Sequence, residues 1–177
     1  MSPHDVLPQT YTVIPGRSAV LIKARSNVGP ISFATSEVEG TLSAVFGDGL
    51  IGATGILDGR LSISLKGLTS GNNLYDTELR RRIDARRHPL AILELTSATS
   101  VPGTTKYELV SSIEFHNMTR TISGVASIEI SRENTVVVRG EQILDVRDFN
   151  LETPTTLALK IYPDVLVEMH LEGCIQV

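Results

Sequence analysis

The sequence predicts an all-β fold, an antiparallel sandwich or barrel, interrupted by one helix. Apolar and polar residues alternate with a period of two along nearly the whole chain. Turn-forming residues separate these stretches at hairpin spacing, which is typical of antiparallel strands. Val, Ile, Leu, Thr and Ser dominate over Ala, Lys and Glu, and this bias favours strands.

The alternation predicts about eight to ten strands. Residues 59–67 are an example, because Leu61, Ile63 and Leu65 share one face while serine and lysine occupy the other. Further predicted strands, in chain order, are SAVLIKAR, PLAILELTS, KYELVSSIEFH, TISGVASIEIS, NTVVVRGEQIL and PDVLVEMHLEG.

Only residues 71–87 have a helical pattern. Leu74, Leu79 and Ile83 recur at near-helical spacing, and Pro89 is expected to end the helix. The segment also holds five of the chain's twelve arginines, between Arg80 and Arg87.

Composition limits the function classes. A chain of 177 residues suits one domain, so residues 1–177 are taken as a single unit. A net charge of −4 does not suit a general nucleic-acid binder. No stretch approaches the roughly 20 apolar residues of a membrane helix, and the first thirty residues hold no apolar stretch of signal-peptide length. We therefore expect a cytoplasmic location, no nucleic acid partner and no integral membrane segment.

The sequence assigns no catalytic residue, metal ligand or cofactor. The four histidines lack metal-ligand spacing, and no local signature of nucleophilic catalysis is present. The single cysteine, Cys174, excludes a disulfide framework and is expected to be an ordinary thiol. We therefore expect that the protein is not an enzyme.

The arginine cluster has two interpretations. Arg80, Arg81, Arg82, Arg86 and Arg87 can form a solvated helix surface, partly offset by nearby carboxylates. Alternatively they capture an anion, because guanidinium groups bind phosphate bidentately. A basic helix at the mouth of a barrel would suit an amphiphile with an anionic head.

Several motifs, in order, resemble the YceI-like proteins. Residues 68–80, LTSGNNLYDTELR, look like that family's strand-to-helix segment, with Asp76, Leu79 and Arg80 matching its Asp-x-x-Leu-Arg helix. Further similarities are RHPLAILE, NMTRTIS, DVRDFNL and the closing strand VLVEMHLEG. The helix departs from the family, since RRIDAR replaces an aromatic stretch and Tyr75 replaces a basic residue.

The resemblance implies a lipocalin-like antiparallel β-barrel of about eight strands, with one helical excursion packed against it and an elongated apolar cavity. Family members are associated with polyisoprenoid or similar long-chain amphiphiles, often as dimers. We therefore expect a long-chain isoprenoid or similar amphipathic lipid as partner, and a homodimer as a possible state. An aliphatic interior suits such a chain, since burial contributes about 0.8 kcal/mol per CH₂.

The first hypothesis is non-catalytic binding, carriage or sequestration of this lipid in the barrel interior. The expected ligand-binding residues are Val20, Ile22, Phe33, Leu61, Ile63, Leu65, Tyr75, Leu79, Arg80, Arg81, Leu93 and Phe115. Tyr75, Arg80 and Arg81 are placed near the head group. Arg82, Arg86 and Arg87 are expected to be largely exposed.

Two alternatives remain open. The first is a protein-interaction or scaffold module whose barrel is solid, since small barrels often are. The second is an enzyme acting on a lipid, which ranks last because no acid–base pair, nucleophile or metal cluster is evident. A cavity volume separates the first two hypotheses, because ligand pockets are about 300–1,000 Å³.

Overall fold

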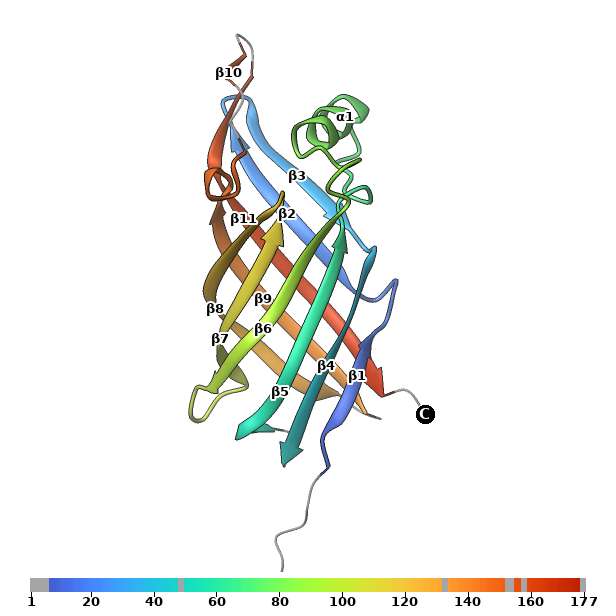
Figure 1. The fold of residues 1–177 in the computed structure, drawn as a ribbon, viewed down its shortest axis with the longest axis vertical. Coiled ribbons are helices and arrows are strands. Elements are labelled where there is room, and N and C mark those ends of the chain that lie inside the picture. Colours follow the sequence, from blue (N-terminus) through green and yellow to red (C-terminus); the bar gives the residue numbers. More distant parts are fainter. Residues whose placement is uncertain (1–6, 48–49, 132–133, 152–154, 157–158, 176–177) are drawn as a thin grey trace, which may run out of the picture.

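The fold is a closed antiparallel barrel that carries one helix at one end (Figure 1). The structure is a computed structural model and describes residues 7–47, 50–131, 134–151, 155–156 and 159–175. The strands are β1 (Gln9–Val13), β2 (Ala19–Ser26), β3 (Gly29–Thr35), β4 (Val38–Gly47), β5 (Leu50–Ser64), β6 (Leu90–Ser100), β7 (Lys106–Phe115), β8 (Met118–Ser131), β9 (Thr135–Asp145), β10 (Thr155–Thr156) and β11 (Leu159–Ile175). The helices are α1 (Asn73–Arg82) and the 3-10 turn η1 (Val146–Phe149).

The strands follow the order β1-β4-β5-β6-β7-β8-β9-β11-β2-β3. The ring closes because β1 pairs with both β4 and β11. The segments β1 and β2 lie end to end along β11, and β3 and β4 likewise share one position, so the barrel has eight strands. All these pairings are antiparallel, which confirms the fold class predicted from the alternation.

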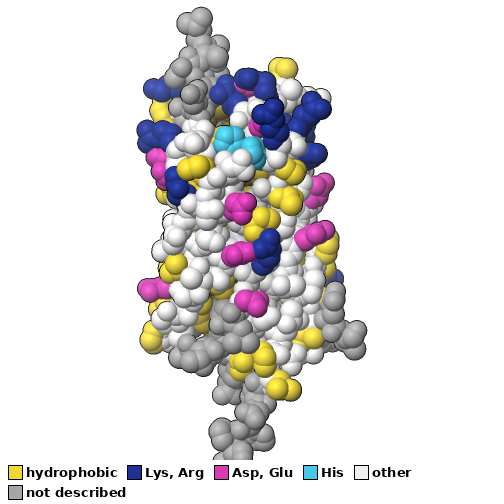
Figure 2. All heavy atoms as spheres, in the orientation of Figure 1, with side chains coloured by type: hydrophobic (Ala, Val, Ile, Leu, Met, Phe, Trp, Pro, Cys, Tyr) yellow, Lys and Arg dark blue, Asp and Glu magenta, His cyan; other side chains and the backbone are white. Residues whose placement is uncertain are grey.

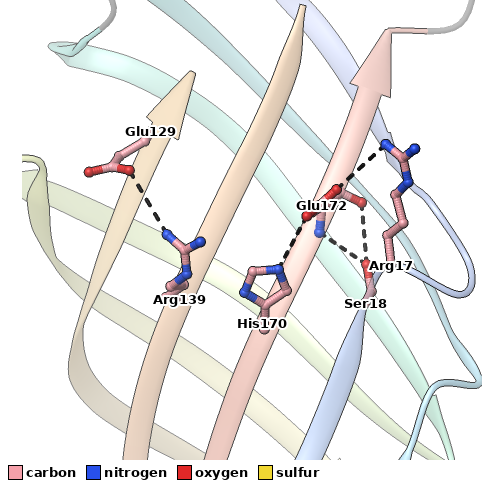
Figure 3. A network of polar contacts seen from close by, with 6 residues as sticks. All are labelled: Arg17, Ser18, Glu129, Arg139, His170 and Glu172. Atoms are coloured by element: carbon pink, nitrogen blue, oxygen red, sulfur yellow. Dashed lines mark hydrogen bonds and ion pairs between the residues drawn. The ribbon is translucent and has the colours of Figure 1, made fainter. Parts of the chain in front are cut away.

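A serine completes the ladder where β1 breaks from β2. The break falls at Pro15 and Gly16, whose φ of 82° favours glycine. The Ser18 hydroxyl accepts a hydrogen bond from the backbone N–H of Glu172 at 3.0 Å and donates to its carbonyl oxygen at 3.3 Å (Figure 3). Ser18 thus gives the N–H of Glu172 an acceptor where the strand is interrupted, while the Glu172 carbonyl also accepts from the N–H of Ile14 at 2.7 Å.

Strand β11 shows which face points inward. Val167, Met169 and Leu171 line the barrel interior. The alternate residues His170 and Glu172 carry polar contacts on the outer wall, with 3.4 Å between His170 Nε2 and Glu172 Oε1 (Figure 3). Further outer-wall ion pairs join Arg17 to Glu172, Lys23 to Glu168 and Arg139 to Glu129.

Three clusters of buried apolar residues are spaced along the barrel. One cluster includes Tyr11 of β1 together with Ala44, Tyr107, Ile128 and Val136. A middle cluster comprises Val20, Val38 and Leu61. The cluster beneath α1 comprises Ile31, Phe33, Leu65, Leu68, Ile83 and Ala85.

Helix α1 confirms the predicted helical excursion, with a shorter extent. Asn72 caps its start, since the side-chain oxygen accepts from the N–H of Leu74 at 3.0 Å and of Tyr75 at 3.4 Å. The helix ends at Arg82 rather than near Pro89. Asp84 has a φ of 47° and turns the chain there, so the residues before Pro89 form turns.

The close approach of β4 and β5 yields a stability prediction. A Cβ at Gly40 would overlap the carbonyl oxygen of Arg60, a backbone atom that cannot move aside. Gly40→Ala is therefore expected to lower the free energy of unfolding by about 1–3 kcal/mol, measured by urea denaturation. Gly124→Ala is the control, because its Cβ would meet only the flexible end of Gln142. Equal effects of the two substitutions would contradict this assignment.

Candidate lipid-binding cavity

Two cavities lie in the barrel interior that the described residues enclose. The larger, of about 230 Å³, lies between α1 and the strands, and is called here the upper cavity. The smaller, of about 110 Å³, lies nearer β1 and is called the lower cavity. Ile63 lines the upper cavity and Leu61 the lower, and both side chains lie on the same face of β5. The two cavities are therefore stacked along the barrel axis.

The walls of the upper cavity are almost entirely apolar. Aliphatic side chains from β2, β3, β5, β6 and β11 form its sides, and Phe115 and Phe149 add aromatic surface with ring centroids 5.6 Å apart. The charged residues among the described lining are Glu78 and Arg82, both from α1. A hydrocarbon chain fits such walls, and the charged partners that the described lining offers to a polar group lie on α1.

Most predicted site residues line a cavity. Those in the upper cavity are Val20, Ile22, Phe33, Ile63, Leu65, Tyr75, Leu79 and Phe115. Those in the lower cavity are Leu61 and Leu93. Whether these residues contact a ligand stays a prediction.

The arginines of this segment differ in their position relative to the cavities. Arg80 and Arg81 line neither cavity. The Arg81 side chain is 69% exposed, whereas that of Arg82 is only 23% exposed and lines the upper cavity. Arg82 was expected to be exposed, and this was wrong. Arg86 and Arg87 are exposed, as predicted.

Helical periodicity explains why Arg82 faces inward. Tyr75, Glu78, Leu79 and Arg82 occupy positions i, i+3, i+4 and i+7, which share one face of a helix. The apolar spacing of Leu74, Leu79 and Ile83 alone does not place Arg82 on this face. Tyr75 is the residue that could have predicted this orientation. When Tyr75 is counted with Leu79 as part of the buried face, Arg82 falls on the same face.

Glu78 joins two arginines at the cavity mouth. Its Oε1 lies 2.6 Å from Arg82 Nη2 and 2.8 Å from Arg81 Nη2, and its Oε2 accepts from Arg81 Nε at 3.1 Å. The hydrogen bonds from Arg81 are the main reason why the pKa of Glu78 lies below its ordinary value, and the Arg82 charge adds to them. Glu78 is therefore ionised at neutral pH.

Asp76 fixes the start of α1. It is 5% exposed and accepts hydrogen bonds from the Ser70 hydroxyl at 2.6 Å and the Ser70 N–H at 2.7 Å. The adjacent Thr69 pairs with Ala34 of β3 through two backbone hydrogen bonds of 2.9 and 3.0 Å. The helix is thereby attached to the barrel wall.

Asp76 and Arg80, which lie one helical turn apart, interact only through a longer-range attraction. No ion pair within 4.0 Å joins them among the residues that the structure describes. The Ser70 hydroxyl is the largest cause of the lowered pKa of Asp76, and the Arg80 charge contributes less.

The motif around Phe149 closes another side of the upper cavity. Asp145 caps η1 by accepting from the N–H of Arg147 at 2.9 Å, and Phe149 is 3% exposed. His116 Nδ1 lies 3.1 Å from the carbonyl oxygen of Phe149, and its ring packs at 4.9 Å against that of His88. Two loop segments are thus joined beside α1.

Neither a metal cluster nor a membrane-spanning helix occurs in the described part of the chain. No group of three or more His, Cys, Asp or Glu side chains is placed there to hold a metal ion. No described helix is long and apolar enough to cross a membrane.

Solved structures share this fold. A polyisoprenoid-binding domain from Saccharophagus degradans, implicated in plant cell wall breakdown, superposes with a TM-score of 0.77 at 12% identity, covering 95% of this chain and 99% of that one. BcnA from Burkholderia cenocepacia superposes with a TM-score of 0.75 at 17% identity, covering 90% of this chain and 98% of BcnA. A Campylobacter jejuni YceI protein superposes with a TM-score of 0.67 at 11% identity, covering 83% of this chain and 86% of that protein.

The likeness confirms the fold that the sequence motifs indicated. No family model and no curated protein matches the sequence. At identities of 11–17% the shared feature is the fold, which is that of the YceI-like barrels.

The buried carboxylate of Asp76 predicts a pH-dependent stability. Its pKa in the folded protein lies below the unfolded value of about 3.9, so stability is gained above that value and lost as the pH falls through the folded pKa. Asp76→Asn should lower the Tm at pH 7, and the two proteins should converge in acid below the folded pKa. Asp58→Asn, at an exposed position, is the control. A constant Tm difference at all pH values would contradict the prediction.

Proposed function

We propose that the protein binds the hydrocarbon chain of a long-chain amphiphile, most simply a polyisoprenoid lipid, inside the barrel without transforming it. The observation that carries this proposal is the upper cavity, whose apolar walls end at two charged residues of α1, Glu78 and Arg82. An apolar chain gains about 0.8 kcal/mol for each buried CH₂, so a few isoprene units supply most of the affinity.

The stacked cavities support an extended ligand. The lower cavity continues the interior beyond Leu61 and Leu93, so a chain that enters beside α1 has apolar surface ahead of it. The similar domain from Saccharophagus degradans is described as polyisoprenoid-binding, and this agrees with the proposal. A cytoplasmic location and a homodimer remain predictions from the sequence.

One observation favours the alternative of an interaction module with a solid core. The upper cavity, at about 230 Å³, is smaller than the roughly 300–1,000 Å³ typical of ligand pockets. A barrel that serves only as a scaffold would keep such a space as a packing defect. The two proposals differ in what happens when the space is filled.

The substitution Ala91→Phe distinguishes the lipid-binding barrel from the solid-core interaction module. Ala91 lines the upper cavity, and a phenyl ring there would occupy the space proposed for the ligand. We expect at least a tenfold loss of farnesol affinity by titration calorimetry, with the free energy of unfolding changed by less than about 1 kcal/mol. Ala34→Phe, on the exposed face of β3, is the control and should bind normally.

The opposite result would support a solid barrel. If Ala91→Phe lowers the free energy of unfolding by about 1–3 kcal/mol, the usual cost of overpacking, and the unmodified protein binds no farnesol, the proposed function is wrong.

A further inference from the structure

The end of the barrel that carries α1 concentrates positive charge. Figure 2 shows Lys and Arg side chains gathered at this end, although the whole chain has a net charge of −4. Arg81, Arg86 and Arg87 belong to α1 and the turn that follows it, and all three are exposed. Because the protein as a whole is negative, this concentration gives one end an electrostatic character that the rest of the surface lacks.

A second pair of cations lies beside the turn between β2 and β3. Arg25, near the end of β2, and Lys160 of β11 lie 5.5 and 5.4 Å from the centroid of the Tyr162 ring, and both are exposed. The backbone N–H of Asn27 in the turn donates to the carbonyl oxygen of Lys160 at 3.0 Å. The turn and the start of β11 therefore form one continuous surface.

The carboxylates at this end leave part of the positive charge uncompensated. Among the residues that the structure describes, three of these cations have no carboxylate within 4.0 Å, namely Arg25, Arg86 and Lys160. Glu78 and Asp84 are held in ion pairs by neighbouring arginines. Asp148 and Asp164 are exposed, but their charges interact with that of Arg147 on η1.

Exposed apolar side chains stand among these cations. Leu74, in the first turn of α1, is 80% exposed, and Val28, in the turn between β2 and β3, is 61% exposed. Tyr162 is 37% exposed and also lines the upper cavity, so its ring lies where that cavity approaches the surface. Apolar side chains and a tyrosine interspersed with Lys and Arg are typical of protein surfaces that bind at a lipid–water interface.

We propose that this end of the barrel docks onto the surface of an anionic lipid bilayer. The cations of α1 and of the β2–β3 turn face the charged headgroups, and Leu74 and Val28 enter the headgroup region. A bilayer matches both features, because anionic lipids attract Lys and Arg, and apolar side chains gain by leaving water. A nucleic acid would match the charge but would leave Leu74 and Val28 in water.

Docking in this orientation places the α1 side of the upper cavity against the lipids. Tyr75 and Leu79 of α1 line that cavity together with Tyr162 of β11. A lipid that leaves the bilayer would therefore meet the cavity without crossing the outer wall of the barrel. The docking surface goes beyond the proposed function and does not depend on it, because its side chains act whether or not the cavity is occupied.

The test is flotation of the full chain with lipid vesicles. Vesicles of phosphatidylglycerol and phosphatidylcholine in equal parts should bind the unmodified protein at low salt. Pure phosphatidylcholine vesicles should bind it at least tenfold more weakly, because they lack the net negative charge. Raising the salt from about 50 mM to about 500 mM should release the protein from the mixed vesicles, since the shorter Debye length screens the attraction.

Three variants locate the surface. Arg86→Glu reverses one unpaired cation of the docking end and should weaken binding to the mixed vesicles about tenfold. Lys106→Glu is the matched control and should leave binding unchanged, since Lys106 is exposed at the start of β7, at the other end of the barrel, and its reversal alters the net charge equally (Figure 1). Leu74→Ser should also weaken binding about tenfold, with an unaltered dependence on salt, because it removes apolar burial and no charge.

Several results would overturn the proposal. These are no binding to the mixed vesicles, equal binding to both kinds of vesicle, and an equal loss for Arg86→Glu and Lys106→Glu, since attraction would then depend on net charge alone. The comparison of vesicles uses the unmodified protein, so it decides even if a variant does not fold. Farnesol binding in solution is measured without vesicles, so a failure of docking leaves the proposed function standing.

Discussion

The structure depends on the double pairing of β11, which makes the barrel a closed ring. One edge of this strand pairs with β9 over its length from Asp164 to Cys174, and the other pairs with β2 and then β1. Closure leaves no free edge between these strands, and it forces alternate side chains into one enclosed interior. Ser18 maintains the pairing where β1 and β2 separate. The cavities exist only because this ring is complete.

The interior stays partly empty because of the side chains that face it. The chain has four Phe, four Tyr and no Trp, so branched aliphatic residues provide most of the inward surface. Such side chains cover the wall of an eight-stranded barrel without reaching its axis everywhere, and small barrels of this size either fill or hold one ligand. Interior voids are few in well-packed proteins, so two stacked cavities are unusual for a protein interior.

The sequence predicted the barrel well because period-two alternation is imposed by the strand itself. Leu61, Ile63 and Leu65 were expected to share a face, and all three are inward-facing. The end of α1 and the orientation of Arg82 were not predicted. The end of α1 is set by the left-handed turn at Asp84, and the orientation of Arg82 by a buried helix face that includes Tyr75 as well as Leu79. A local pattern of three apolar residues does not contain that information.

We propose that an amphiphile lies along the barrel axis, with its head beside α1. The most direct measurement is anomalous diffraction from crystals soaked with 12-bromododecan-1-ol, whose bromine marks the end of the chain. We predict a bromine peak inside the barrel, on the side of the upper cavity away from Arg82 and towards Leu61 and Leu93. A bromine peak confined to the outer wall, or beside Arg82 with the hydroxyl pointing away, would contradict the account.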